Sequence, residues 1–249
     1  MNYGTFAGLY DQLFDEEAYE DWLAYAKATI KNPKGRLLEL AGGAGRLAIM
    51  LKQAGINDVY NFDLSPEMLG LAAKHAEEAQ VDLPLIEGDM REWSDLDLTF
   101  QTITCFADSL NYLENEQDVL QTFKQVYNHL EAGGQFIFDV ITPVQTDEVY
   151  PGYMFNWHDD ETAFMWSSFG VEGQKHNVEH ELTFFLYQED IDGYRQLQEI
   201  HTERTYPLAT YEKLLKEAGF TDVQVTADFG RTSDTKEATR WFFNTTKGA

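Results

Sequence analysis

The chain has few basic residues and no segment in which they gather. Its 249 residues contain 18 lysines and arginines against 43 aspartates and glutamates, which gives a formal net charge of −25. Such a surface repels phosphate backbones, so a duplex or a long RNA is disfavoured as a partner. High solubility is the other consequence of an acidic surface. The sequence therefore predicts that nucleic acid is not the partner of this protein.

Cysteine occurs once, at Cys105. A single cysteine excludes a disulfide bond within the chain and favours a reducing compartment. Two further features are missing: a basic N-terminal region followed by an apolar one, and an apolar run long enough to span a bilayer. These absences predict a cytoplasmic protein that has no membrane partner. Because Cys105 stands in an apolar segment, we expect it in the core and not as a nucleophile.

Short apolar segments that alternate with helical patterns make up the first half of the chain. Helical periodicity follows most of these segments, for example over 47–54 and from Pro66 onward. Strands that alternate with helices predict an α/β fold with a doubly wound parallel sheet, whose ligands bind beyond the carboxyl ends of the strands. The expected strands are Leu37–Leu40, Val59–Phe62, Leu83–Ile86, Thr102–Phe106 and Gln135–Val140.

A glycine-rich turn follows the first expected strand. Glycine allows the backbone to turn sharply and to approach a ligand closely. Glu39 precedes the turn, and Asp63 ends the next strand, where an acid can bind ribose hydroxyls. A dinucleotide fold sets its pyrophosphate on the helix N-terminus, and a carboxylate inside the loop disfavours that arrangement. A glycine-rich turn also occurs without a ligand, but the two acids favour a nucleoside that lacks phosphate.

The segment Glu39-Leu40-Ala41-Gly42-Gly43-Ala44-Gly45 resembles the first motif of class I S-adenosylmethionine-dependent methyltransferases, acid-x-Gly-x-Gly-x-Gly. Ala41 stands where the family usually has its first glycine, so we expect a negative φ there or room for its methyl group. The resemblance covers about 36–142 and 207–246. It implies a mostly parallel, seven-stranded, Rossmann-like sheet whose seventh strand inserts antiparallel.

The resemblance also implies S-adenosyl-L-methionine as the cofactor. The turn backbone would face its methionine part, Asp63 would bind the ribose, and Leu64 would pack on the adenine. Asp89 and the Met90 N–H would recognise the adenine edge, and the Phe106 carbonyl would accept from the methionine amine. The implied cofactor-binding set is Tyr10, Glu39, Ala41, Gly42, Gly43, Gly45, Asp63, Leu64, Met68, Asp89, Met90 and Phe106.

The chain divides into three parts by pattern. Residues 1–33 have aromatic residues at helical spacing and are expected to form a lid, with Tyr10 closing on the cofactor. Residues 34–142 and 207–249 form the cofactor-binding domain. Between them, 143–206 loses helical periodicity and predicts an inserted antiparallel sheet that caps the substrate. An exposed aromatic sheet of this kind could pair with a second copy of the chain.

Methyl transfer from a sulfonium is an in-line displacement, so the enzyme mainly positions the acceptor and excludes water. A base is needed only if the acceptor must lose a proton. Asn111 and Tyr112 follow the fourth strand, in a loop that lies near the transferred methyl group in related enzymes, although the prolines of an Asn/Asp-Pro-Pro-Tyr motif are missing. His201, in the inserted region, is the candidate base. The spacing of His176 and His180 would bind metal on a helix but not on a strand, so no metal is expected.

The sequence therefore predicts a methyltransferase that moves a methyl group from S-adenosylmethionine to a small molecule. Two alternatives stay open: an NAD(P)-dependent oxidoreductase, and a non-catalytic scaffold that keeps the cofactor-binding fold. The acid inside the loop motif and the lack of a Tyr-x-x-x-Lys pattern disfavour the oxidoreductase. Binding of S-adenosylmethionine or NAD would separate the first two functions, and methyl-transfer turnover would separate an enzyme from a scaffold.

Overall fold

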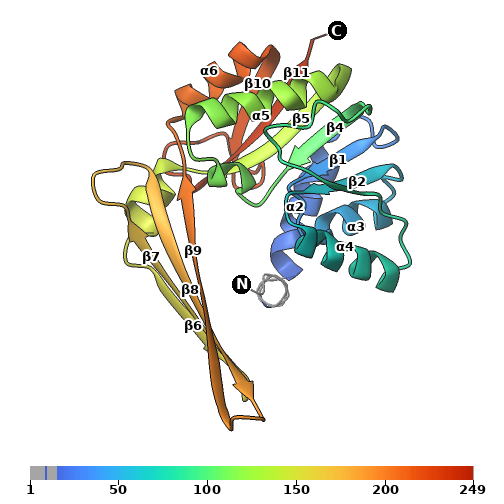
Figure 1. The fold of residues 1–249 in the computed structure, drawn as a ribbon. Coiled ribbons are helices and arrows are strands. Elements are labelled where there is room, and N and C mark those ends of the chain that lie inside the picture. Colours follow the sequence, from blue (N-terminus) through green and yellow to red (C-terminus); the bar gives the residue numbers. More distant parts are fainter. Residues whose placement is uncertain (1–8, 10–15, 249) are drawn as a thin grey trace.

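A seven-stranded sheet forms the centre of the computed structural model, which describes residues 9 and 16–248 (Figure 1). The strand order is β10-β11-β5-β4-β1-β2-β3. Neighbouring strands from β5 to β3 run parallel, whereas β11 lies antiparallel between β10 and β5. The strands are β1 (Leu37–Leu40), β2 (Val59–Asp63), β3 (Leu85–Glu87), β4 (Phe100–Cys105), β5 (Leu130–Ile141), β10 (Phe220–Ala227) and β11 (Arg240–Lys247). The expected fold class and the antiparallel last strand are confirmed.

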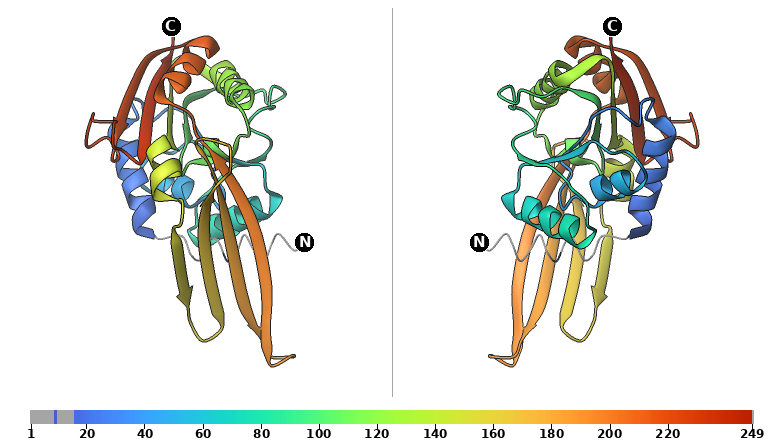
Figure 2. Two further views of the ribbon diagram at one scale, coloured as in Figure 1. Left: turned by 90° about the vertical axis from the view of Figure 1, so that its left-hand side faces the viewer. Right: turned by 90° about the vertical axis from the view of Figure 1, so that its right-hand side faces the viewer.

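Helices cover both faces of this sheet, and each face has its own apolar core (Figures 1 and 2). One core packs α5 (Glu116–His129) and α6 (Leu208–Ala218) on the strands, and the other packs α2 (Glu16–Thr29), α3 (Arg46–Gln53) and α4 (Pro66–Glu78). Within the described part of the chain, no helix is both long and apolar enough to cross a membrane.

The helix that follows β2 begins at the residues that its sequence marks. Ser65 is the N-cap of α4 and accepts a hydrogen bond from the Met68 N–H at 3.2 Å, and Pro66 occupies the first helical position. Serine satisfies an otherwise unpaired amide there, and proline has no N–H to lose. This cap fixes the start of α4 directly beside the carboxyl end of β2, where Asp63 lies.

Residues between β5 and α6 form a separate four-stranded antiparallel sheet. Its strands β6 (Met154–His158), β7 (Thr162–Gly170), β8 (Asn177–Gln188) and β9 (Gly193–Arg204) pair in chain order, as expected. The sheet extends away from the seven-stranded body (Figures 1 and 2). Its small core consists of Phe164, Leu182 and Phe184, and Leu9 packs against it.

Two helix boundaries do not follow the local sequence signals, a Gly-Gly pair for a helix end and a threonine for a helix cap. Helix α5 ends at His129, because β5 begins immediately at Leu130, and Gly133 and Gly134 lie inside that strand instead of ending the helix. Gly133 has φ 74°, which lets the strand bend where its pairing with β4 shifts register. Helix α6 begins after Pro207, so Thr210 lies in its first turn and is not its cap.

Candidate active site

The turn after β1 leaves no room for a side chain at its centre. A Cβ atom on Gly42 would lie 2.0 Å from Oδ1 of Asn61, and the Gly42 N–H already donates to the Phe62 carbonyl at 3.0 Å. Gly43 and Gly45 have φ 51° and 72°, values that glycine adopts without steric cost. A Cβ on Gly43 would have no neighbour closer than the Met68 sulfur at 4.0 Å, so the turn is packed tightly at Gly42 and open at Gly43.

Ala41 takes a conformation that the sequence did not predict. Its φ is 55°, in the left-handed region, so the expectation of a negative φ is wrong. Alanine pays a steric cost in that region, and glycine, the usual family residue, does not. The turn geometry therefore overrides the intrinsic preference of residue 41.

Glu39 lies beneath the turn and is 3% exposed. Burial, with a smaller contribution from the Asp139 charge, raises the pKa of its carboxyl to about 8, while a hydrogen bond with the Thr104 hydroxyl opposes the shift. The Thr104 hydroxyl also lies 3.3 Å from the Leu38 carbonyl. A hydroxyl has one hydrogen for these two acceptors, so a protonated Glu39 satisfies both contacts.

Asp63 joins the glycine-rich turn to the start of α4. Its carboxylate accepts from the Gly43 N–H at 2.7 Å and from the Ser65 N–H at 2.9 Å. Burial raises its pKa, and these two backbone donors lower it. A carboxylate has about four acceptor positions, so Asp63 keeps capacity for the hydroxyls of a ribose.

Three more residues of the implied cofactor set surround the motif. Leu64, next to Asp63, is 66% exposed, an unusual state for a leucine beside a buried turn. The Met68 sulfur lies 4.0 Å from the position of a Cβ on Gly43. Phe106 is buried at the end of β4, and its carbonyl already accepts from the Ser109 hydroxyl at 2.8 Å. Tyr10 falls outside the described residues.

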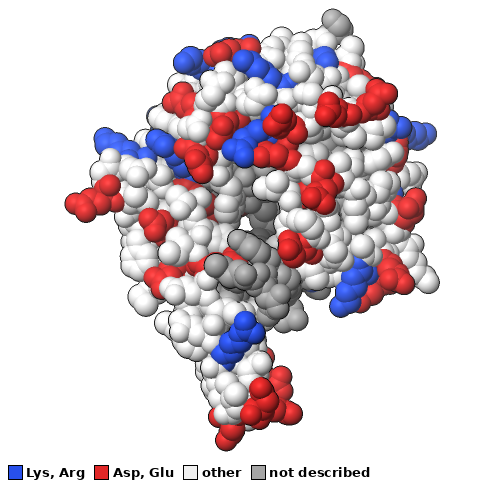
Figure 3. Space-filling model, viewed as in Figure 1, with Lys and Arg blue, Asp and Glu red and all other residues white. Residues whose placement is uncertain are grey.

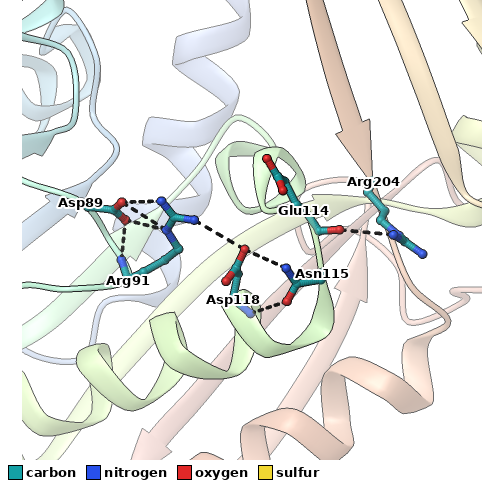
Figure 4. A network of polar contacts seen from close by, with 6 residues as sticks. All are labelled: Asp89, Arg91, Glu114, Asn115, Asp118 and Arg204. Carbon is teal, nitrogen blue, oxygen red and sulfur yellow. Dashed lines mark hydrogen bonds and ion pairs between the residues drawn. The ribbon is translucent and has the colours of Figure 1, made fainter.

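Asp89 belongs to a network of polar contacts on the β3–β4 side of the molecule (Figure 4). Arg91 contacts both of its carboxylate oxygens, with Nη2 at 2.6 Å, and reaches Asp118 at 3.5 Å. The guanidinium holds the pKa of Asp89 below its usual range. The neighbouring Met90 is half-buried, and its carbonyl accepts from the Trp93 indole at 3.0 Å. An adenine edge would therefore meet an Asp89 that is already paired with an arginine.

Asn111 is fully buried and connects three parts of the fold. Its Nδ2 donates to the Arg204 carbonyl at 2.8 Å, and its Oδ1 accepts from the Ile141 N–H at 3.0 Å. These bonds join the loop after β4 to the ends of β5 and β9. With its amide engaged in this way, Asn111 is suited to position the loop; its catalytic role stays a prediction.

The structure brings the other two candidate catalytic residues together. The Tyr112 hydroxyl lies 3.4 Å from Nδ1 of His201, and Nε2 of His201 lies 3.1 Å from Glu199. A tyrosine, a histidine and a carboxylate in this order can pass a proton from the hydroxyl to the ring. The pairing supports a joint role of these residues.

The carboxyl end of β4 carries backbone strain beside a charged cluster. Ala107 and Asp108 both have positive φ, 54° and 53°. Non-glycine residues in this region cluster at functional sites. Asp108 lies 3.2 Å from Nη1 of Arg240, which also contacts the buried Asp139. Burial raises the pKa of Asp139 to about 6, and the Arg240 charge opposes that shift.

A second acid faces this cluster from the inserted sheet. Glu203 is 5% exposed, and its pKa is raised by burial and by the charge of Asp108. Its Oε2 lies 3.6 Å from Nε2 of His180. Because His180 pairs with His201 across β8 and β9, and Glu203 follows two residues later, all three share one face of the sheet. Tyr150 lies edge-on to His180, with ring centroids 4.7 Å apart.

A cavity of about 380 Å³ lies on the other side of β9. Thr202 and Arg204 line it, and these residues alternate with Glu203 along the strand, so they point to the opposite face. Among residues 9 and 16–248, no group of histidine, cysteine and acidic side chains could bind a metal ion.

Comparison with known proteins finds methyltransferases among the relatives of this chain. A family model described as "Methyltransferase domain" matches residues 37–134. YqeM of Bacillus subtilis (strain 168), named as a methyltransferase, is 36% identical over 99% of this chain and 98% of its own. The chain belongs to the class I S-adenosylmethionine-dependent methyltransferases.

Two further relatives agree with this assignment. A solved S-adenosylmethionine-dependent methyltransferase from Clostridium acetobutylicum ATCC 824 has a TM-score of 0.83 and 27% identity, with 99% of each chain covered. Glycine/sarcosine N-methyltransferase from Halorhodospira halochloris is 25% identical over 88% of this chain and 78% of that protein. The methyltransferase prediction is thus confirmed, with S-adenosylmethionine as cofactor. Three features of the site fit S-adenosylmethionine: the open position at Gly43, the remaining acceptor positions of Asp63 and the exposed side chain of Leu64.

Sequence reasoning missed the charged groups that the inserted sheet and the last strand contribute. Asp139 had a local signal, since it is an acid inside the apolar run Phe136–Ile141. Arg240 and Glu203 had no local signal in the sequence, because each becomes buried beside its partner only when distant segments meet.

Proposed function

We propose that this methyltransferase transfers a methyl group from S-adenosylmethionine to a small-molecule acceptor by in-line displacement. One observation carries the proposal: the inner face of the inserted sheet, with His180 and Glu203, lies against the strained end of β4. The charges of Asp108 and Arg240 both act on the buried Glu203 carboxyl. A position beside these buried groups suits a small acceptor, and the net charge of −25 disfavours nucleic acid. The Halorhodospira halochloris relative is named for two small molecules, glycine and sarcosine, which agrees with a small-molecule acceptor.

When bound, S-adenosylmethionine supplies an already activated methyl group. The residues of this chain would bind it and exclude water. The backbone at 41–43 would face its methionine part, Asp63 would accept from its ribose hydroxyls, and Leu64 would cover its adenine. Glu39, beneath the turn, would support that turn, and Asn111 would position the loop that leads to Tyr112.

The three-part organisation expected from the sequence also belongs to this proposal: a lid at 1–33, a cofactor domain at 34–142 and 207–249, and a substrate cap at 143–206. Helix α2, in the first part, buries Trp22, Tyr25 and Ala26 in the body. A reducing compartment such as the cytoplasm suits the single cysteine.

Association of two copies through the inserted sheet is a further part of the proposal. Its edge strand β6 exposes Met154, Phe155 and Trp157, and an exposed apolar edge strand can pair with another. Sedimentation of the wild type and of Trp157→Lys would test it. A dimer that the variant abolishes is expected, and a monomeric wild type would rule it out.

Calorimetric titration with S-adenosylmethionine tests the cofactor site. Asp63→Ala should weaken binding by about tenfold or more. A hydrogen bond between a hydroxyl and a carboxylate contributes roughly 1.5–3 kcal/mol, and about 1.4 kcal/mol corresponds to a tenfold change in affinity. Asp58→Ala is the matched control, since this acid precedes β2 and pairs with Arg36 at 3.1 Å. Equal affinity of the two variants would contradict the assigned role of Asp63.

A turnover screen tests the acceptor class. Formation of S-adenosylhomocysteine would be followed with small amines, carboxylates and hydroxyl compounds, and in parallel with duplex DNA, RNA and a protein extract. We expect turnover with a small molecule only. Methylation of a macromolecule without small-molecule turnover would overturn the proposal.

A further inference from the structure

Acidic groups outnumber basic ones in the cluster shared by the inserted sheet and the adjoining ends of β4, β5 and β11. The charge of Asp108 acts on both Asp139 and Glu203, and Arg240 is the cation that acts on both of them. Arg240 already contacts both Asp108 and Asp139. Glu203 is therefore not needed to balance the guanidinium, which two other carboxyl groups already contact.

One carboxylate oxygen of Glu203 has no hydrogen-bond partner within the described residues. This oxygen, Oε2, is buried, and Nε2 of His180 lies 3.6 Å from it, just beyond hydrogen-bonding distance. A buried carboxylate without a donor is costly. Such a group in an active site indicates that a ligand supplies the donor.

The orientation of His180 follows from its other contacts. The Trp166 indole N–H, which can only donate, lies 3.1 Å from Nδ1, and the Ser168 hydroxyl lies 2.7 Å from the same atom. Nδ1 is therefore the acceptor, and the ring proton is on Nε2, which faces Glu203. His180 in this form is neutral, so it orients the carboxylate without cancelling its charge.

We propose that Glu203 binds the amino group of the methyl acceptor, which makes the acceptor a small primary or secondary amine. The inference rests on the proposed function as a small-molecule methyltransferase. Glu203 lies on the inserted sheet and is not among the residues assigned to the cofactor, so its unpartnered carboxylate oxygen is available to the acceptor. His180, facing the carboxylate with its N–H, is the positioning residue.

The amine, the Glu203 carboxylate and the sulfonium account for every bond and proton in the methyl transfer. The bound ammonium gives one proton to the Glu203 carboxylate, and its nitrogen then has a lone pair. The N–C bond forms as the S–C bond of the sulfonium breaks, which leaves neutral S-adenosylhomocysteine and a methylated ammonium. Glu203 then returns its proton to solvent. The groups that face Glu203 during these steps are His180 on β8, Asp108 after β4, Arg240 on β11 and Tyr150 before β6.

The test compares matched ligands on the complex with S-adenosylhomocysteine. Calorimetry would use glycine, ethanolamine and glucosamine against glycolate, ethylene glycol and glucose, with the wild type, Glu203→Gln and Glu181→Gln. Glu181 is the control because it lies on the opposite face of β8 and accepts from Gln198. In the wild type we expect amines to bind about tenfold or more tighter than their hydroxyl partners. Glu203→Gln should lose this preference, and Glu181→Gln should keep it.

Two results would overturn the inference, and a third would overturn the proposed function. An equal affinity of the wild type for amines and hydroxyl compounds would overturn the inference, as would an amine preference that survives in Glu203→Gln. If Glu203→Gln binds S-adenosylhomocysteine with unchanged affinity, the variant is folded. Its lost preference for amines then reflects a change in acceptor binding. If the wild type does not bind S-adenosylhomocysteine at all, the proposed function itself fails, which distinguishes the two failures. His180→Asn should lower the preference for amines without altering cofactor affinity.

Discussion

Ala41 has a left-handed backbone with φ 55° at the position where glycine is usual. A left-handed conformation costs an L-residue about 1–2 kcal/mol. Glycine removes that cost, although its greater freedom in the unfolded chain offsets about half of the gain. Ala41→Gly should therefore raise the free energy of unfolding by about 0.5–1 kcal/mol. Urea unfolding in the absence of cofactor would measure the change.

Ala44→Gly is the matched control for this change. Ala44 lies in the same turn but outside the left-handed region, and it is buried. Glycine there gains no relief of strain, so we expect a lower free energy of unfolding. The same sign for both variants would show that backbone strain at Ala41 is not the cause.

Glu39 links the stability of the protein to pH. Its pKa is about 8 in the folded protein and near 4.5 in the unfolded chain. The folded state therefore binds an extra proton between these two values, so this group lowers the free energy of unfolding as pH rises from about 4.5 to 8. Below pH 4.5 both states are protonated and the group has no such effect.

Glu39→Gln removes this titration. The difference in the free energy of unfolding between variant and wild type should grow in favour of the variant by up to about 4 kcal/mol between pH 5 and pH 8. Parallel urea titrations across that range, without cofactor, would measure it. A difference that does not change with pH would mean that Glu39 is ionised in the folded protein.

At the scale of elements, the inserted sheet has a core of its own. Phe184 is fully buried between Phe164 and Leu182, and this cluster is distinct from the two cores of the body. Phe184→Ala should lower the stability of β7–β9 by about 3–4 kcal/mol, because it leaves a cavity in a small core. Since these residues lie outside the cofactor site, the affinity for S-adenosylmethionine should not change.

Amide hydrogen exchange would locate the effect of Phe184→Ala. Protection should fall in β7–β9 and stay unchanged in β1, β4 and β5. Phe155→Ala on the edge strand is the control, since that side chain is 43% exposed and its removal should cost less than about 1 kcal/mol. Loss of protection throughout the molecule would show that the two sheets unfold as one unit.

At the scale of the whole molecule, the excess of negative charge is the dominant electrostatic feature. Acidic side chains are spread over the face shown in Figure 3 and gather at the tip of the inserted sheet. That tip exposes Asp159, Asp160, Glu161, Glu189, Asp190 and Asp192. Repulsion among like charges destabilises a compact state, and salt screens it over about 10 Å at 0.1 M.

The thermal unfolding midpoint should therefore rise with salt. Between 0.02 and 0.3 M NaCl we expect an increase of roughly 2–4 °C, which corresponds to about 1 kcal/mol for a chain of this size. Calorimetry at pH 7.5 would measure it, with sucrose as a control for effects of the solute on hydration. A midpoint that falls with salt would mean that ion pairs outweigh the repulsion.

The sequence by itself determined the fold class, the strand–turn–helix unit around Glu39 and Gly42, the position of Asp63 and the four strands of the inserted meander. Each of these depends on local information. Glycine permits the turn, apolar periodicity separates strands from helices, and an acid at the end of a strand stays at that end wherever the strand packs.

Only the tertiary structure decided the protonation of Glu39, the left-handed conformation of Ala41 and the pairing of Arg240 with Asp108 and Asp139. It also decided that Glu203 and His180 face the end of β4 from a sheet nearly a hundred residues away. These features depend on burial and on contacts between distant segments. A side chain's charge state and partner are set by the atoms that surround it, and the order of residues along the chain does not specify those atoms.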